Sequence, residues 1–186
     1  MKTLPFVFID LETTGISPLK HEILEIGLVR AEQTGDATCP LREIKRLALK
    51  ISPEHIENAD PKALQINHYD PKAWEGAMVF KDAAPMLEEE LKGHILVAQN
   101  VTFDVSFLER AYERIGKSLN ALVYYHKLDL ASLAMGTKYW DPSYKRFTLN
   151  ELAERTGVVN THAHSALADA VATFEIANML LKRELN

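Results

Sequence analysis

The sequence predicts a single α/β domain in which helices flank one mixed sheet. The first third of the chain contains three strand-like segments with short connections, which is typical of an antiparallel meander. The remainder alternates helical and strand-like segments, which is typical of layered α/β domains. We find no internal repeat and no linker in the 186 residues, and this length suits one domain spanning residues 1–186.

The N-terminal segments have strand character. Residues 6–9 form a continuous run of aromatic and β-branched side chains, which indicates a strand buried on both faces. Residues 11–18 contain threonine, glycine, serine and proline, so we expect a loop there. The next two strands are expected at 23–32 and 44–51, with a turn at 33–36.

Helical patterns become frequent after residue 52. The segment 53–80 is rich in proline and predicts short helices and loops, and 82–92 predicts a helix with a solvated face of Glu88, Glu89 and Glu90. The remaining expected elements are a buried strand at 95–98, an amphipathic helix at 102–115 closed by Gly116, a strand at 122–130, short helices at 131–135 and 149–155, and a long, largely buried helix at 165–184.

Composition and charge exclude several classes of protein. A hydrophobic share of 47% excludes intrinsic disorder, and the single cysteine, Cys39, excludes an intrachain disulfide and favours a cytoplasmic protein. No segment approaches the ~18 apolar residues of a membrane span, and neither a signal peptide nor a lipidation motif is visible, so we expect no membrane partner. The net charge of −5 argues against a broad basic surface for nucleic acid.

Acidic residues stand next to apolar structure in three segments. Asp10 and Glu12 directly follow the first apolar run, and residues two apart in a strand project to the same face. Asp104 heads the apolar stripe of its predicted helix, and Asp169 belongs to a similar stripe in the last helix. Chance pairing among 26 acids and a helix-dipole preference for Asp104 are the alternative explanations.

His164 precedes Asp169 by five residues. In one continuous helix this separation turns the two side chains about 140° apart, so they converge only if His164 lies at or before the helix start. A histidine in such a place is more often a surface or capping residue, and we assign that ordinary role to His162.

Four carboxylates at the ends of apolar elements repel one another and call for compensating cations. Oxygen ligands favour hard ions such as Mg²⁺ or Mn²⁺, whereas one cysteine and scattered histidines offer no zinc site. Two such ions about 3.5–4 Å apart would balance four acids, which is the arrangement used for in-line displacement at phosphodiesters.

These segments resemble the three motifs of the DEDD exonuclease superfamily, in the branch with a catalytic histidine (DEDDh). The first motif is Phe-Ile-Asp-Leu-Glu-Thr-Thr-Gly at 8–15, and the second is Val-Ala-Gln-Asn-Val-Thr-Phe-Asp-Val-Ser-Phe-Leu at 97–108. The third is His-Ser-Ala-Leu-Ala-Asp at 164–169, with the His-x₄-Asp spacing of this branch. The motifs occur in the family's order and extend over almost the whole chain. Ribonuclease T, oligoribonuclease and polymerase proofreading exonuclease domains are similar in size and layout.

The resemblance implies a ribonuclease H-like fold and removal of nucleoside monophosphates from the 3′ end of single-stranded DNA or RNA. It implies that Asp10, Glu12, Asp104 and Asp169 hold two Mg²⁺ or Mn²⁺ ions, with Asp10 bridging them, and that His164 is the general base for the attacking water. The residues that it places near the terminal nucleotide are Leu11, Thr13, Thr14, Asn100 and Phe103.

Gln99 departs from the family pattern, because many members carry histidine at this position. Since Gln99 is not a metal ligand in that pattern, we expect altered local packing or substrate contact and retained activity. All five catalytic positions are filled, which argues against an inactive relative.

Basic and aromatic residues alternate in the segment 138–147. This composition is typical of surfaces that bind single strands through phosphates and base stacking. It is also typical of a loop that its aromatic residues anchor while its basic groups are simply solvated, and we favour this second interpretation. Ile66, Asn67 and His68 are a weaker candidate for a substrate-lining segment.

Several alternatives stay open at this point. The chain is either a self-sufficient exonuclease, a proofreading-type module that acts mainly through a DNA polymerase partner, or a metal-dependent phosphohydrolase for small phosphoesters. The preference for DNA or RNA and the formation of a homodimer are not readable from the sequence. Four of the negative charges belong to the predicted site, so the rest of the chain carries about −1 and we expect a local grip on a strand end.

Overall fold

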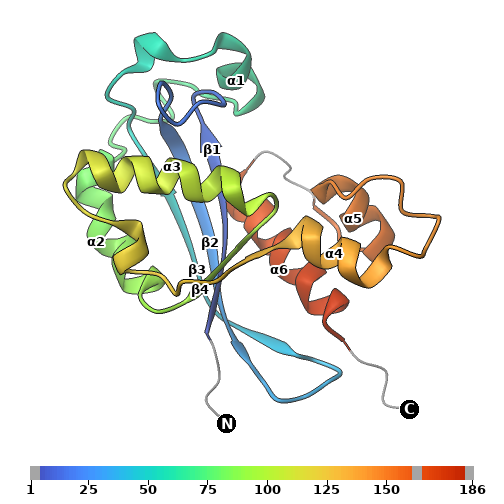
Figure 1. The fold of residues 1–186 in the computed structure, drawn as a ribbon. Coiled ribbons are helices and arrows are strands. Elements are labelled where there is room, and N and C mark those ends of the chain that lie inside the picture. Colours follow the sequence, from blue (N-terminus) through green and yellow to red (C-terminus); the bar gives the residue numbers. More distant parts are fainter. Residues whose placement is uncertain (1–4, 161–164, 183–186) are drawn as a thin grey trace.

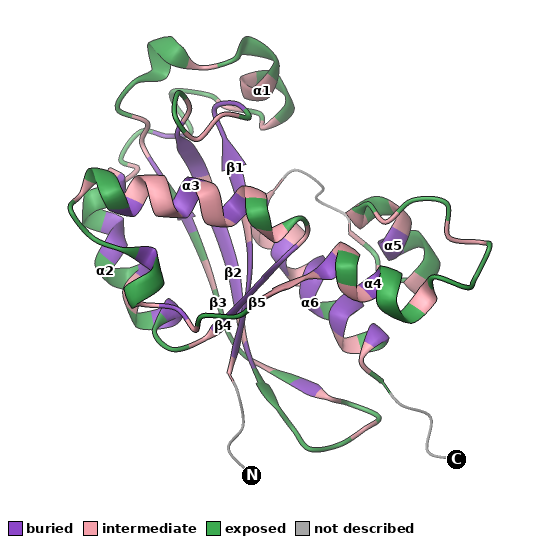
Figure 2. Cartoon of the chain, viewed as in Figure 1, coloured by how far each residue is buried: buried purple, intermediate pink, exposed green. Residues whose placement is uncertain are grey.

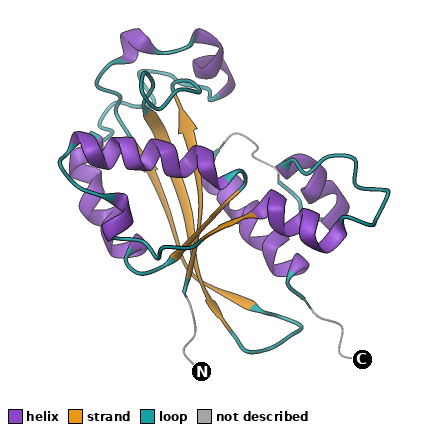
Figure 3. Ribbon diagram, viewed as in Figure 1, coloured by secondary structure: helices purple, strands orange, loops and turns teal. Residues whose placement is uncertain are grey.

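The computed structural model describes residues 5–160 and 165–182, and it shows one five-stranded sheet with helices on both faces (Figure 1 and Figure 3). The strands are β1 (Phe6–Thr13), β2 (Ile23–Gln33), β3 (Leu41–Lys50), β4 (Ile95–Ala98) and β5 (Lys127–Asp129). The helices are α1 (Pro61–Ile66), α2 (Phe80–Leu91), α3 (Val101–Arg114), α4 (Leu130–Lys138), α5 (Leu149–Thr156) and α6 (Ala166–Leu180), with short 3₁₀ turns at Ile56–Asn58 and Leu119–Ala121.

The sheet combines an antiparallel and a parallel half. Its strand order is β3-β2-β1-β4-β5. β1 pairs with β2 and β2 with β3 in antiparallel fashion, which confirms the predicted meander. β4 lies parallel to β1 on its other side, and β5 lies parallel to β4. The central strand β1 therefore lies where the antiparallel half meets the parallel half.

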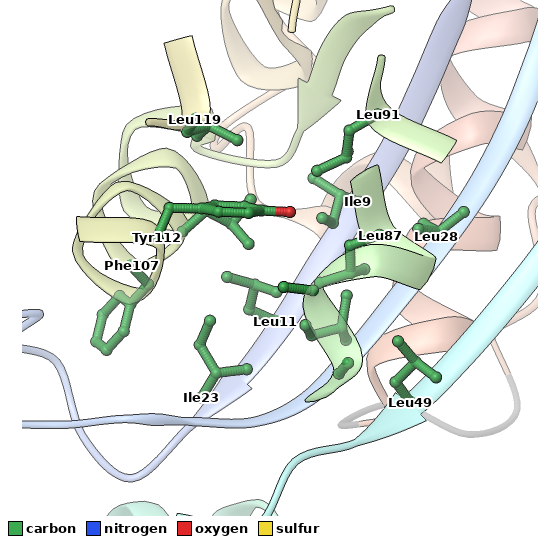
Figure 4. Close-up of a cluster of buried hydrophobic side chains, with 14 of the residues drawn as sticks. Ile9, Leu11, Ile23, Leu28, Leu49, Leu87, Leu91, Phe107, Tyr112 and Leu119 are labelled. Atoms are coloured by element: carbon green, nitrogen blue, oxygen red, sulfur yellow. The ribbon is translucent and has the colours of Figure 1, made fainter. Parts of the chain in front are cut away.

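Two hydrophobic clusters cover the two faces of the sheet. One face packs against α2 and α3, and Figure 4 shows side chains from this cluster, including Ile9, Leu87 and Tyr112. The other face packs against α4, α5 and α6 around Phe8 and Phe174, whose rings meet edge to face. Because helices cover both sides, β1 is buried along most of its length (Figure 2), which confirms the prediction from its apolar run.

The long helix α6 is apolar around most of its circumference. It contacts β1 and β2 on one side and α4 and α5 on the other, so it has little exposed surface. This burial confirms the prediction for the last helix. Gly116 has a φ of 72° just beyond α3, which confirms its role in ending that helix.

Two strand boundaries differ from the prediction. β1 continues to Thr13, because residues 11–13 pair with β2 instead of forming a loop. The expected strand at 122–130 is confined to Lys127–Asp129. The preceding residues instead follow a 3₁₀ turn, in which Leu122 and Val123 donate backbone hydrogen bonds to Leu119.

Glu90 corrects a further expectation, since it is buried and does not belong to a solvated face. Its carboxylate forms ion pairs with Arg30, at 3.2 Å, and with Lys45. Both partners come from the neighbouring strands β2 and β3, so the helix periodicity of α2 alone does not reveal the pairing.

The described helices have no segment of the length and apolarity that crossing a lipid bilayer requires.

Candidate active site

Strand β1 directs two carboxylates toward helix α6. Phe6 and Phe8 belong to the cluster beneath α6, and side chains alternate along a strand. The next even-numbered positions are Asp10 and Glu12, which therefore face the same helix. The sequence-predicted pairing of these two acids on one face is correct, although both lie within the strand and not after it.

Helix α6 adds a third carboxylate to this pair. Asp169 lies in its first turn, and one carboxylate oxygen from each of Asp10, Glu12 and Asp169 lies within 4.8 Å of the other two. We call these three residues the acid cluster. They are 159 positions apart at most in the chain, as the residue numbers show, and the packing of α6 on β1 and β2 brings them together.

Gly27 allows α6 to approach the sheet closely enough for this arrangement. It pairs directly with Asp10 across the β1–β2 ladder. A Cβ atom at Gly27 would lie 2.1 Å from the backbone carbon of Ala166 and 2.2 Å from the nitrogen of Leu167. Sequence reasoning missed this residue, although a glycine inside a predicted strand is a known signal of close backbone approach.

Asn160 orients Asp169. Its side-chain amide donates a hydrogen bond to a carboxylate oxygen of Asp169. Sequence reasoning assigned no role to Asn160, which lies four positions before the third motif. Its contact leaves the rest of the Asp169 carboxylate facing Asp10 and Glu12.

Asp104 approaches the acid cluster from helix α3 on the other side of β1. Its side chain is 3% exposed and accepts a hydrogen bond from the Leu11 backbone. Asp129 holds the start of this helix, because its Oδ2 accepts a hydrogen bond of 2.9 Å from the Val101 N–H. Sequence reasoning also missed Asp129. The pattern Asp-x-x-Ser marks it as the N-cap of α4, whereas its contact with α3 depends on the fold.

The site is a region of unfavourable negative charge in the metal-free protein. Burial raises the pKa of Asp10 well above its ordinary value, and the nearby charges of Asp104 and Asp169 raise it further. Burial raises the pKa of Glu12 from 4.5 to about 7, with a further contribution from Asp169. Burial also raises the pKa of Asp104, although backbone hydrogen bonds, including the one from Leu11, oppose this increase.

The donor set fits divalent cations that prefer oxygen. All three members of the acid cluster offer carboxylate oxygens, and burial together with the charges of neighbouring acids raises the pKa values of Asp10 and Glu12. Hard ions with a preference for carboxylates match this chemistry. The arrangement therefore supports binding of divalent metal ions.

His164, the predicted general base, lies outside the described residues, as does His162. The described chain resumes at Ser165, the N-cap of α6, four positions before Asp169. The role of His164 stays a prediction.

The five predicted nucleotide contacts surround the ends of β1 and β4. Leu11 is buried in the core beside α3, and Phe103 lies half-buried against Phe107 on that helix. Asn100 is exposed at the start of α3 in the left-handed conformation, with a φ of 62°. Their contact with a nucleotide stays a prediction.

Thr13 and Thr14 are buried, and their hydroxyl groups already have partners. The Thr13 hydroxyl donates to the Gly15 carbonyl, and the Thr14 hydroxyl accepts from the Glu22 N–H, both at 2.8 Å. These bonds shape the turn after β1. The amide of Asn67 in turn donates to the Thr13 carbonyl at 2.8 Å, which joins the predicted segment 66–68 to this end of the site.

Comparisons with known proteins agree with this geometry. A family model described as exonuclease matches residues 7–177. The chain is 30% identical over 179 residues to a PolC-type DNA polymerase III of Caldanaerobacter subterraneus subsp. tengcongensis, which covers 96% of this chain and 12% of the polymerase. It is 28% identical over 178 residues to the PolC-type enzyme of Clostridium perfringens, which covers 96% of this chain and 11% of that one.

Solved structures of exonuclease I share the fold. The E. coli enzyme in complex with a dT13 oligonucleotide aligns with a TM-score of 0.78 at 20% identity, covering 97% of this chain and 41% of the other. Exonuclease I from Methylocaldum szegediense aligns with a TM-score of 0.78 at 19% identity and the same coverage. The chain thus spans less than half of the exonuclease I proteins and about an eighth of the polymerases.

Proposed function

Because the chain belongs to the exonuclease family, we propose that this nuclease removes nucleotides one at a time from the 3′ end of single-stranded nucleic acid, as one domain over residues 1–186. The observation that carries the proposal is the convergence of the acid cluster. Three separate motifs of the sequence supply its members and Asp104, in the order typical of DEDD exonucleases.

Asp10, Glu12, Asp104 and Asp169 would hold two divalent ions, Mg²⁺ or Mn²⁺. Bound ions would activate the attacking water and stabilise the negative charge that develops on the phosphate and on the leaving 3′-oxygen. The chain itself positions these ligands through the Gly27 contact, the Asn160 hydrogen bond and the rigid start of α3.

His164 would accept the proton of the attacking water. Its unperturbed pKa near 6.5 suits a general base at neutral pH. Its place directly before Ser165, the N-cap of α6, keeps it within a few residues of Asp169.

The comparison with relatives favours single-stranded DNA as the substrate of this chain. The similar exonuclease I of E. coli was crystallised with a dT13 oligonucleotide, and the PolC-type relatives are DNA polymerases. The PolC relationship also favours a second candidate function, in which the chain proofreads through a DNA polymerase partner. A homodimer and a cytoplasmic location are further expectations. Sedimentation in solution tests the first, and fractionation of cells tests the second.

The direct test uses single strands of DNA and RNA with a 5′ label, incubated with Mg²⁺, Mn²⁺ or a chelator. The proposal predicts a metal-dependent ladder that shortens from the 3′ end, and no cutting of a circular single strand. Asp10→Ala and His164→Ala should nearly abolish the ladder. Glu89→Ala, an exposed acid on α2, is the matched control and should retain activity.

Three results separate the alternatives. A ladder that persists in Asp10→Ala, or cleavage inside the strand, contradicts the proposal. Hydrolysis of small phosphoesters without any need for a strand end favours the phosphohydrolase instead. Activity that appears only after addition of a DNA polymerase favours the proofreading module.

A further inference from the structure

The loop between α4 and α5 contains two aromatic pairs that differ in burial. Tyr144 and Phe147 stack nearly parallel, with ring centroids 6.1 Å apart, and pack against the core beneath α6. Tyr139 and Trp140 meet edge to face at 4.8 Å, and Trp140 is 89% exposed. The inner pair therefore anchors the loop, whereas Tyr139 and Trp140, which we call the outer pair, face solvent.

Three cations accompany the outer pair in this part of the chain. Hydrogen bonds from Ser143 and, to a smaller extent, the charge of Lys138 lower the pKa of Asp141. Lys138 at the end of α4 and Lys145 and Arg146 farther along the loop form no ion pair with any residue in the described ranges. Exposed aromatic rings and cations without a close ion pair in the same loop match the bases and phosphates of a single strand. The solvated-loop interpretation of the sequence explains the inner pair but not the outer pair.

Gln99 connects this loop to the acid cluster. Phe8 on β1 pairs with Val97 on β4, so the next positions on the same face are Asp10 and Gln99. The Gln99 side-chain amide donates a hydrogen bond of 2.7 Å to the Phe147 carbonyl. The inner end of the loop is thereby fixed to the strand that lies beside Asp10.

The Gln99 side chain, which stands where many members of the family carry histidine, is only partly satisfied by hydrogen bonds among the described residues. Its Oε1 is buried and has no hydrogen-bond partner among the described residues, so the contact to Phe147 is the one bond that this side chain makes there. An unpaired buried oxygen is unfavourable. Gln99 is thus poorly explained as a contributor to stability and better explained as a residue that holds the loop in place.

We propose that the outer pair, with Lys138, Lys145 and Arg146, binds the single strand upstream of the nucleotide being removed, and that Gln99 is a positioning residue for this surface. Bases stack on Tyr139 and Trp140, and the cations neutralise phosphates, so binding is tolerant of sequence. The inference rests on the proposed function and adds a second, upstream contact to it. It predicts that long strands bind better than short ones.

The first test compares Trp140→Ala with the wild type on a series of 5′-labelled single strands from two to twenty nucleotides. We expect KM to rise about five- to tenfold for the longest strands, with unchanged kcat and unchanged hydrolysis of the dinucleotide. Tyr125→Ala is the matched control, since Tyr125 is 70% exposed but precedes the start of β5, whereas α4 and its loop follow the other end of that strand. Equal KM values for Trp140→Ala and the wild type at every length overturn the proposal.

The second test examines Gln99→Met, which keeps the side-chain length and removes the hydrogen bond to Phe147. We expect the same selective rise in KM for long strands with kcat and dinucleotide hydrolysis unchanged. A loss of dinucleotide hydrolysis that equals the loss on long strands would place the effect in the acid cluster and overturn the positioning role.

A binding measurement separates failure of this inference from failure of the proposed function. The chain has two tryptophans, and Trp74 is 7% exposed, so Trp74→Phe leaves Trp140 as the fluorescent reporter. Stacking predicts quenching of Trp140 by a twenty-nucleotide strand with Ca²⁺ present, whether or not the strand is degraded. If the wild type degrades long strands but Trp140 shows no quenching, the upstream binding surface is contradicted and the proposed exonuclease activity is not. If the wild type shortens no strand, the proposed function itself is contradicted.

Discussion

At the residue scale, the site is built from groups that destabilise the metal-free fold. The pKa values of Asp10 and Asp104 are raised well above their ordinary values, and burial is the largest cause in both. Keeping these carboxyls ionised at neutral pH therefore opposes folding. Either protonation or a bound cation relieves this cost, which links the chemistry of the site to its stability.

The first prediction concerns Asp10→Asn in the presence of chelator at pH 8. Removing the charge relieves repulsion from Asp104 and Asp169, so the free energy of unfolding should rise by about 1 kcal/mol or more. This corresponds to a melting temperature about 2–4 °C higher in calorimetry. Metal-dependent nuclease activity of the same variant should fall at least about 100-fold. A variant that loses both stability and activity would show that Asp10 has a structural role instead.

The second prediction concerns the pH dependence that Glu12 introduces. Its pKa rises from 4.5 to about 7 in the folded protein, so the folded state binds the proton more tightly than the unfolded chain. The stability that this proton contributes is fully present below pH 4.5 and is lost as the pH rises toward 7. Urea unfolding of the chelated protein should therefore show a decrease of about 2–3 kcal/mol from this group between those values.

Divalent ions should reverse this trend. Because a protonated Glu12 competes with the metal, Mn²⁺ should stabilise the protein more at pH 8 than at pH 5. Glu12→Gln should remove the share of the decrease between pH 4.5 and 7 that Glu12 contributes, while Asp10 and Asp104 keep theirs. An unchanged profile in that variant would mean that another group carries it.

At the element scale, the position of α6 decides whether the three acids meet. Gly27→Ala places a methyl group 2.1–2.2 Å from the α6 backbone, so the helix start has to move away from β1 and β2. We expect a loss of about 1–3 kcal/mol in stability, measured by urea unfolding, and weaker metal binding.

Gly136→Ala is the matched control for this substitution. Gly136 lies within α4, and a Cβ atom there meets nothing within 4 Å. Alanine should therefore be neutral or slightly stabilising in this helix. If Gly27→Ala behaves like Gly136→Ala, close packing of α6 does not control the acid cluster.

Asp129 links the starts of two helices. Its Oδ2 accepts from the Val101 N–H at the start of α3, and its Oδ1 accepts from the Ser132 N–H in α4 at 2.7 Å. Asp129→Ala should cost about 1–2 kcal/mol in thermal unfolding and should reduce activity by displacing Asp104. Asp141→Ala, which removes a bond to the Ser143 N–H within the α4–α5 loop, should change catalysis of a dinucleotide little.

Elements with a strong local pattern could be predicted from the sequence. The apolar run at 6–9 and the stripe headed by Asp104 identified β1 and α3, and the motif spacing placed Asp10, Glu12 and Asp169 together. The prediction was wrong where tertiary contacts determine the burial of a residue or the length of a strand. The burial of Glu90 depends on cations from β2 and β3, and the short β5 depends on a competing 3₁₀ turn.

At the scale of the whole molecule, the topology places the site where the antiparallel and parallel halves of the sheet meet. The strand order β3-β2-β1-β4-β5 puts β1 in the centre, with α3 on one face and α6 on the other (Figure 1). Because a helix packs on each face of β1, Asp104 of α3 and Asp169 of α6 lie close to Asp10 and Glu12 at the C-terminal end of this strand. The approach of Gly27 and the hydrogen bond of Asn160 are properties of this assembled molecule, so the sequence patterns did not reveal them.

Most of the negative net charge of the chain comes from the acids of the site. Four acids of the site account for most of the formal −5, and the α4–α5 loop carries two exposed cations, Lys145 and Arg146. This distribution favours local contact with a strand end and its upstream segment over tight binding to long duplex.

Counting bound Mn²⁺ tests the central claim, that the acid cluster and Asp104 form a site for two divalent ions. Titration at pH 8, followed by calorimetry and by the electron paramagnetic resonance of free Mn²⁺, should give two ions per chain in the wild type. Asp169→Asn should lose at least one of them while the folded structure is kept, as checked by circular dichroism. Absence of Mn²⁺ binding in the wild type, or an identical isotherm in Asp169→Asn, would contradict the account.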